Sequence, residues 1–230
     1  MCEALYNGTD RRDGKTINKP KKSSWRGLTG LGGIMTIYHT DIVILAAGAS
    51  TRLGRPKQLL PWQDKTLLQH AVQSALAITT QPVVVTGANA DQLVAGLNHH
   101  QVQVVFNPEW QQGIASSIHC GLQALLNRTP TPDQVIFMVC DQPFVTAGLL
   151  LELINERQNT RKAIVASAYG GTIGIPALFD KSMFSQLLDL QGDTGAKKLI
   201  QQNADEVAVV NFPKGNIDVD TLEEYEKLIS

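Results

Sequence analysis

An alternation of short apolar runs with amphipathic segments, beginning at Asp41, constrains the fold of this 230-residue chain more than any other feature. The alternation predicts βαβ units, in which a helix returns the chain so that the next strand can join a largely parallel sheet. The apolar runs are rich in β-branched residues, which is typical of strands buried on both faces. The predicted strands are 41–47, 82–87, 102–107, 134–140, 163–168 and 206–210.

The segments between these runs carry the apolar spacing of helices. Apolar side chains recur at helical intervals from Leu67 and again from Ile114, and further helices are predicted over 147–157, 195–202 and 221–229. The order of elements indicates an α/β fold with three layers, α/β/α, around a mostly parallel sheet. Sheets of this kind bind their ligands beyond the carboxyl ends of the strands.

Composition and charge narrow the classes of function. Hydrophobic residues make up 43% of the chain and charged residues 18%, which suits a soluble globular domain with a sizeable core. The formal net charge is -1, so no basic field would draw the chain to nucleic acid. No apolar run approaches the ~18 residues of a membrane span. The three cysteines show neither CxxC spacing nor the density of a disulfide scaffold, so we expect a cytoplasmic protein.

The first 34 residues differ from the rest of the chain, because they are rich in Lys, Arg, Gly and Ser and lack a periodic apolar pattern. We therefore expect residues 1–34 to form a disordered extension and residues 35–230 to form one domain. A mis-called start, with the natural protein beginning at Met35, is our interpretation of this extension.

The loop after the first predicted strand is built to approach an anion closely. Its small residues, 46–50, allow main-chain N–H groups to come near a phosphate. Arg52 and Lys57 follow and supply positive charge, the first as a two-pronged donor and the second as a point charge. The loop matches neither GxxxxGK[ST] nor GxGxxG. An ordinary turn with solvated charges is the alternative.

Acidic residues follow the most apolar strand and recur near the end of the chain. Asp141 ends the run 134–140, so its carboxylate is predicted at the carboxyl edge of the sheet, where it could hold Mg²⁺. A helix N-cap is the alternative, although Thr146 lies closer to the next helix. Asp218 and Asp220 share a side if their segment is extended, and one of them could instead cap the last helix.

The motifs resemble those of a known family. The stretch LAAGASTRLGRPK resembles the signature LAxGxSxRxGxxK of the nucleotidyltransferases that activate molybdopterin. Further matching segments follow in the same order, and the resemblance covers roughly residues 42–229. These segments are NPEWQQGIASSIHCGL, VCDQPFV, GIPALF, GDTGAKKLI and IDVDTLEEY. The resemblance implies a nucleotidyltransferase domain over 35–230, with a Rossmann-like sheet of the nucleotide-diphospho-sugar transferase type.

Within that family, LAAG followed by KQLLP resembles the molybdenum cofactor cytidylyltransferases, whereas LAGG is typical of the guanylyltransferases. The resemblance implies Mg²⁺-dependent transfer of a cytidylyl group from CTP to the terminal phosphate of molybdopterin, with release of pyrophosphate. A molybdoenzyme would then receive the product. Ala47 favours the smaller base, since a glycine there would leave room for a purine. Leu222 stands where the family has proline.

The resemblance also assigns roles to residues. The Gly48 loop and Arg52 would hold the β and γ phosphates, Lys57 would meet the α phosphate, and Asp141 with Asp220 would hold Mg²⁺. The residues expected to bind the nucleotide are Leu45, Ala46, Ala47, Gly48, Ala49, Ser50, Arg52, Lys57 and Ser117. A second anion site, for the phosphate of the pterin, is expected at Gly192, Asp193, Gly195 and Lys197. Solvated lysines on a helix face are the alternative for this second site. For Ser117 the alternative is an ordinary serine in the first turns of a helix.

Three other functions stay open from the sequence. The first is a guanylyltransferase or another nucleotidyltransferase of the same fold. The second is a non-catalytic carrier of the molybdenum cofactor, although the retained basic and acidic positions argue against a dead site. The third is a dinucleotide-dependent oxidoreductase, against which the absence of GxGxxG counts.

Overall fold

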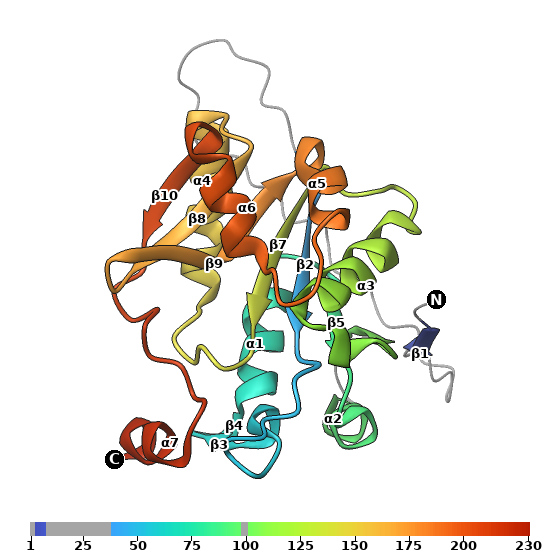
Figure 1. Cartoon of the computed structure of the whole chain (residues 1–230), viewed down its shortest axis with the longest axis vertical. Coiled ribbons are helices and arrows are strands. Elements are labelled where there is room, and N and C mark those ends of the chain that lie inside the picture. Colours follow the sequence, from blue (N-terminus) through green and yellow to red (C-terminus); the bar gives the residue numbers. More distant parts are fainter. Residues whose placement is uncertain (1–2, 8–37, 98–100) are drawn as a thin grey trace, which may run out of the picture.

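The computed structural model describes residues 3–7, 38–97 and 101–230. It contains one eight-stranded sheet and a small hairpin of β3 and β4 (Figure 1). The strands are β1 (Glu3–Asn7), β2 (Thr40–Leu45), β3 (Pro61–Trp62), β4 (Lys65–Thr66), β5 (Val83–Thr86), β6 (Gln103–Phe106), β7 (Gln134–Val139), β8 (Ile164–Tyr169), β9 (Thr172–Asp180) and β10 (Val207–Asn211). The helices are α1 (Leu67–Leu76), α2 (Ala90–Leu97), α3 (Ile114–Leu126), α4 (Ala147–Thr160), α5 (Phe184–Leu188), α6 (Ala196–Gln202) and α7 (Leu222–Ile229).

The large sheet has the strand order β1-β6-β5-β2-β7-β9-β8-β10. β2 lies at the centre and runs parallel to both β5 and β7, while β10 runs parallel to β8. β9 is antiparallel to β7 and β8, and in Figure 1 its arrow points the opposite way to that of β7. The carboxyl ends of β2, β5 and β7 therefore meet at one edge of the sheet.

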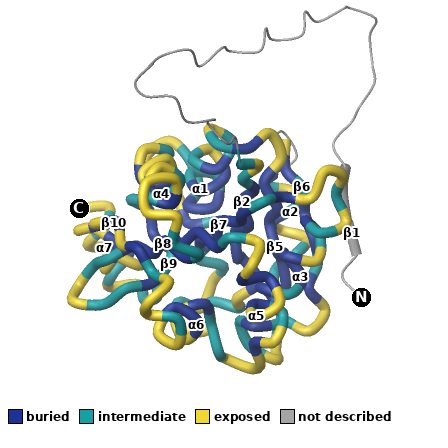
Figure 2. Tube along the Cα trace, turned by 90° about the horizontal axis from the view of Figure 1, so that it is seen from above, coloured by how far each residue is buried: buried dark blue, intermediate teal, exposed yellow. Residues whose placement is uncertain are grey.

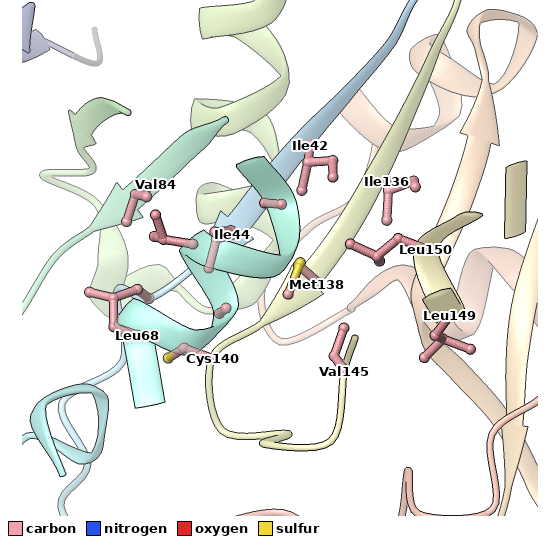
Figure 3. Close-up of a cluster of buried hydrophobic side chains, with 14 of the residues drawn as sticks. Ile42, Ile44, Leu68, Val84, Ile136, Met138, Cys140, Val145, Leu149 and Leu150 are labelled. Carbon is pink, nitrogen blue, oxygen red and sulfur yellow. The ribbon is translucent and has the colours of Figure 1, made fainter. Parts of the chain in front are cut away.

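Helices cover both faces of the sheet, as the view in Figure 2 shows. Side chains alternate along β2, so that Ile42 and Ile44 pack with residues of α1, α2 and α4, whereas Val43 and Leu45 pack with residues of α3, α5 and α6. Figure 3 shows the first of these two clusters, with Leu68 of α1 and Leu150 of α4 facing the sheet. The predicted three-layer α/β/α architecture is confirmed.

All six predicted strands are present, with bounds that differ by a few residues. The predicted helices are confirmed as well, and Thr146 caps α4 by accepting a hydrogen bond from the Leu149 amide at 3.3 Å. β9 was not predicted, because Gly174 and Pro176 interrupt its apolar pattern and its pairing with β7 and β8 is long-range. The short helices α2 and α5 were also not predicted.

Within the expected N-terminal extension, Glu3–Asn7 form β1, which lies at the edge of the sheet and pairs antiparallel with β6. The rest of 1–34, and Met35, lie outside the described residues. Among the described helices, none is both long and apolar enough to cross a membrane.

The C-terminal segment returns from β10 to the carboxyl edge of the sheet. The Val219 amide donates a hydrogen bond to the Asp141 carbonyl at 3.1 Å, and the Tyr225 hydroxyl donates to the Pro61 carbonyl at 2.7 Å. Val219 and Tyr225 are buried in a small cluster with Leu60 and Leu67. This packing holds Asp220, which directly follows Val219, beside the end of β7.

Candidate active site

A cavity of about 380 Å³ opens at the carboxyl ends of β2 and β7. The loop after β2 forms one wall, and the start of α3 with the preceding turn forms the other. The lining residues are Leu45, Ala46, Ala47, Gly48, Ala49, Lys57, Gln58, Trp110, Gln111, Gly113, Ile114, Ser117, Val139, Cys140, Asp141 and Asp193. The cavity thus brings together most of the residues predicted to bind the nucleotide.

The main chain of the loop after β2, which forms the first wall, has N–H groups that can bind an anion. The amides of Ala47, Gly48 and Ala49 donate no hydrogen bond to the described part of the protein. Ala47 is buried, Ala49 is half-buried and Gly48 is exposed. Buried main-chain donors normally find a partner, so the free Ala47 amide favours an acceptor ligand in the cavity, and the two neighbouring amides are open to the same ligand. Gly87 lets this wall pack closely, because a Cβ atom there would lie 2.7 Å from the Ala47 carbonyl oxygen.

A network of basic and acidic side chains lies at the end of β7. Lys57 donates hydrogen bonds to the Asp141 carboxylate and, at 2.6 Å, to Oδ1 of Asp220. Arg52 donates to the other oxygen of Asp220 at 2.5 Å, but its side chain is 69% exposed, against 18% for Lys57. The predicted residues Arg52, Lys57, Asp141 and Asp220 therefore form one connected group.

This network perturbs the protonation of its members. Burial alone would lower the pKa of Lys57, but the Asp141 and Asp220 carboxylates outweigh burial and raise that pKa above its ordinary value. Burial would likewise raise the pKa of Asp220, yet the hydrogen bonds and charges of Lys57 and Arg52 lower it. Lys57 is thus firmly cationic and Asp220 firmly anionic at neutral pH.

The two predicted metal ligands do not cap helices. Thr221 caps α7 through the Glu224 amide, and Thr146 caps α4, so Asp141, Asp218 and Asp220 are not needed for capping. Asp218 is exposed and lines a separate pocket with Phe144 and Leu228.

The donor set can be tested against Mg²⁺ from its own chemistry. Oδ1 of Asp141 is buried and has no hydrogen-bond partner among the described residues, while its other oxygen already binds a cation, Lys57. The described residues hold no cluster of three or more His, Cys, Asp or Glu side chains suited to a metal ion. Mg²⁺ often needs only one or two carboxylates when substrate phosphates complete its shell, so Asp141 and Asp220 fit it.

The opposite wall presents Ser117. The buried Asn107, which was not predicted as a site residue, donates from Nδ2 to Oγ of Ser116 at 2.9 Å and to Oγ of Ser117 at 3.0 Å. Ser116 donates its own proton to the Glu109 and Gly113 carbonyls. Ser117 makes no such donation within the described chain, so its hydroxyl proton is available to a ligand in the cavity.

The four residues expected to form a second anion site lie in two different places in the structure. Gly192 and Asp193 lie at the first site, since the Ala115 amide donates to the Gly192 carbonyl at 3.1 Å and Asp193 lines the cavity. Gly113 has a positive φ of 100°, and a Cβ atom there would lie 2.4 Å from the main chain of Gly192. Glycine therefore allows the turn before α3 to approach Gly192 closely. Gly195 is the N-cap residue of α6, and Lys197 is exposed along that helix.

Comparison with known proteins agrees with this geometry. Residues 42–207 match the family of the MobA-like NTP transferase domain. A nicotine blue oxidoreductase from Paenarthrobacter nicotinovorans is 30% identical over 81% of this chain and 95% of its own length. A molybdenum cofactor cytidylyltransferase from Escherichia coli (strain K12) is 22% identical over 80% of this chain and 93% of its own.

Solved structures give the same result. Rv0371c from Mycobacterium tuberculosis H37Rv matches with a TM-score of 0.72 and 31% identity, over 84% of this chain and 99% of that one. A structure of Rv0371c in complex with manganese matches over the same shares with a TM-score of 0.65 and 29% identity. The chain therefore belongs to the family of MobA-like NTP transferase domains and is a nucleotidyltransferase.

Proposed function

We propose that this protein transfers a cytidylyl group from CTP to the terminal phosphate of molybdopterin carrying molybdenum, and releases pyrophosphate. The observation that carries the proposal is the position of Lys57, held between Asp141 and Asp220 beside a cavity whose wall offers three unpartnered amides. Together these groups match the charge distribution of a nucleoside triphosphate, with donors for the phosphates and carboxylates for their counter-ion.

In the proposed reaction an oxygen of the acceptor phosphate attacks the α phosphorus of CTP. The new P–O bond forms as the bond between the α phosphorus and the α,β-bridging oxygen breaks, and pyrophosphate leaves with that electron pair. The acceptor oxygen is already anionic, so no general base is needed. The protein contributes alignment and charge neutralisation: the Gly48 loop amides and Arg52 bind the β and γ phosphates, and Lys57 stabilises the charge that grows at the α phosphate.

Asp141 and Asp220 would hold Mg²⁺ in this proposal. The ion would neutralise part of the triphosphate charge when bound. The manganese complex of Rv0371c supports a divalent cation in a relative of this fold. Lys57 can then move from the two carboxylates toward the phosphates, because its side chain is long and flexible.

The choice of CTP over GTP rests on Ala47 and on the name of a relative. Ala47 lines the cavity, and in the proposal its methyl group limits the size of the base that the cavity accepts. One relative is named a molybdenum cofactor cytidylyltransferase, and another, from Bacillus mycoides (strain KBAB4), a probable molybdenum cofactor guanylyltransferase at 26% identity. A molybdoenzyme that takes up the product would be the macromolecular partner.

The proposal is tested by measuring pyrophosphate release with each of the four nucleoside triphosphates, with and without molybdopterin. CTP with the acceptor should give the highest rate. A higher rate with GTP would assign the protein as a guanylyltransferase. Binding of the molybdenum cofactor without turnover of any nucleotide would favour a carrier. A reduced nicotinamide dinucleotide serves as a control ligand, because one relative is named an oxidoreductase.

A further inference from the structure

Gln58 is a buried carboxamide that lies directly against the loop after β2. Its side chain is only 1% exposed, yet it carries four hydrogen-bonding positions that need partners. From Nε2 it donates to the Ala46 carbonyl at 2.9 Å and to the Gly48 carbonyl at 2.9 Å. Both protons of the amide are therefore used to hold the main chain on either side of Ala47.

These two hydrogen bonds fix the direction of two of the three unpartnered amides, those of Ala47 and Ala49. A trans peptide is planar, with its C=O and N–H pointing opposite ways. The Ala46 carbonyl shares its peptide with the Ala47 amide, and the Gly48 carbonyl shares its peptide with the Ala49 amide. When Gln58 holds the two carbonyls, both amides point away from Gln58. Ala47 and Ala49 line the cavity, and neither amide donates to the described chain.

The other end of the Gln58 carboxamide is connected, through the Ser50 hydroxyl, to the main chain of Lys57. Oε1 of Gln58 accepts a hydrogen bond from the Ser50 hydroxyl at 3.3 Å, and the same hydroxyl accepts one from the Lys57 amide at 3.1 Å. Ser50 has a φ of 55°, a left-handed conformation that non-glycine residues seldom adopt. Gln58 thus links the anion-binding loop, its tight turn and the start of the Lys57 segment.

We propose that Gln58 is a positioning residue that aims the Ala47 and Ala49 amides at the triphosphate of the bound nucleotide. The inference deepens the proposed function and rests on it. A residue that merely filled space would need no such match between its two protons and the carbonyls of alternate peptides. Gln58 also lines the cavity, but both of its N–H groups are taken up by the Ala46 and Gly48 carbonyls, so it acts on the phosphates through the loop and not as a donor to them.

The test is the variant Gln58→Glu, which keeps the size of the side chain but replaces two donors with a carboxylate facing two carbonyl oxygens. Binding is measured by calorimetry with Mg²⁺ and either CTP or CMP. CTP affinity should fall by roughly tenfold to a hundredfold, in line with the loss of charge-assisted hydrogen bonds. CMP affinity should change by less than about threefold, because CMP lacks the β and γ phosphates.

A matched control is Gln134→Glu at the far end of the sheet. Gln134 is also fully buried, and its Nε2 donates to Oγ1 of Thr40 at 2.6 Å. This variant should be destabilised too, but its ratio of CTP to CMP affinity should equal that of the wild type. If Gln58→Glu does not fold, Gln58→Met removes the donors without adding charge, and the same fall in the CTP to CMP ratio is expected.

The outcomes separate the two proposals. If the wild-type protein binds no nucleoside triphosphate, the proposed function fails. If the wild type binds CTP and the Gln58 variants keep its CTP to CMP ratio, the positioning role is wrong and Gln58 is only structural. A fall in that ratio for the Gln58 variants but not for Gln134→Glu supports the positioning role.

Discussion

Asp41 and Asp141 lie at opposite ends of the neighbouring strands β2 and β7, and their surroundings differ. Asp41 is in β2 near its amino end and is 2% exposed, while Asp141 follows the carboxyl end of β7 and is 15% exposed. Asp41 accepts a hydrogen bond from the Thr79 hydroxyl at 2.7 Å and lies 3.1 Å from Nη1 of Arg128. Arg128 is itself tied to the Gln103 side chain and the Gln81 carbonyl.

At the other end, Asp141 pairs with Lys57, whose remaining partner is the second carboxylate of the network, Asp220. Oδ2 of Asp41 and Oδ1 of Asp141 both make no hydrogen bond within the described chain. Oδ2 of Asp41 nevertheless faces the Arg128 guanidinium at 3.1 Å, whereas Lys57 pairs with the other oxygen of Asp141 and leaves Oδ1 without a cation. The cation at the amino end is thus also held by a main-chain carbonyl and an amide group, whereas the ammonium of Lys57 at the carboxyl end is held by two carboxylates alone. Buried ion pairs of the first kind maintain the fold, and pairs of the second kind leave capacity for binding.

The largest expected effect comes from neutralising each aspartate in turn. Asp141→Asn should lower turnover by roughly 100-fold or more, because the charge that would hold Mg²⁺ in the proposed reaction is lost, while the melting temperature changes little. Asp41→Asn should do the reverse: the free energy of unfolding falls by about 3 kcal/mol as Arg128 loses its partner, and kcat is unchanged. Denaturant titration and pyrophosphate release measure the two effects.

The contrast between the two ends of the sheet is wrong if Asp141→Asn and Asp41→Asn change turnover and stability in the same way. A folded Asp141→Asn protein with turnover within a few-fold of wild type would remove the metal role of Asp141. Loss of kcat in a well-folded Asp41→Asn protein would mean that the amino end of the sheet also acts on the site.

Lys57→Ala should have the next largest effect. In the proposed reaction Lys57 meets charge that develops in the transition state, so kcat should fall by roughly 100-fold to 1000-fold while the KM for CTP changes little. Lys181→Ala is the matched control at the amino end, where the lysine pairs with Asp133 at 3.2 Å and is exposed. Equal kinetics for the two variants would show that the Lys57 pairing is structural.

The architecture could be predicted from the sequence because each strand of the parallel sheet is a short apolar run with a local pattern. Asp141 could be predicted for the same reason, since it directly follows such a run. β9 could not, because what makes it a strand is pairing with β7 and β8 rather than its own interrupted pattern. Local periodicity does not record a partner that is distant in sequence.

The candidate site also contains residues that a local sequence pattern identifies and residues that only long-range contacts bring into place. The loop after β2 was recognisable from its small residues, but the pairing of Lys57 with Asp220 joins residues 163 positions apart, and only a family resemblance pointed to Asp220. Gln58 and Asn107 were not singled out, because a glutamine or asparagine in a sequence does not reveal which buried groups it will meet. Their signal is the burial of a polar side chain, which the fold alone discloses.

Arg52→Ala should have a smaller effect than Lys57→Ala. Arg52 is mostly exposed, so solvent weakens its attraction for phosphate, and its contribution falls on binding as well as on turnover. We expect the KM for CTP to rise by about fivefold to tenfold, with a smaller fall in kcat. Arg55→Ala, in the same loop and over the Tyr225 ring, is the control and should leave KM unchanged. If Arg52→Ala and Lys57→Ala share one kinetic signature, at least one of the two roles is misassigned.

Ala47→Gly should have the smallest effect and bears on the choice of base. If the Ala47 methyl group limits the size of the base in the cavity, its removal should narrow the preference for CTP over GTP by about threefold to tenfold. A glycine also loosens the loop, but that change weakens both nucleotides alike, so the ratio of their affinities isolates the base. Thermal shifts with each nucleotide provide the measurement, and Ala49→Gly is the control, because it loosens the same wall. An unchanged CTP to GTP ratio in Ala47→Gly would mean that another part of the cavity selects the base.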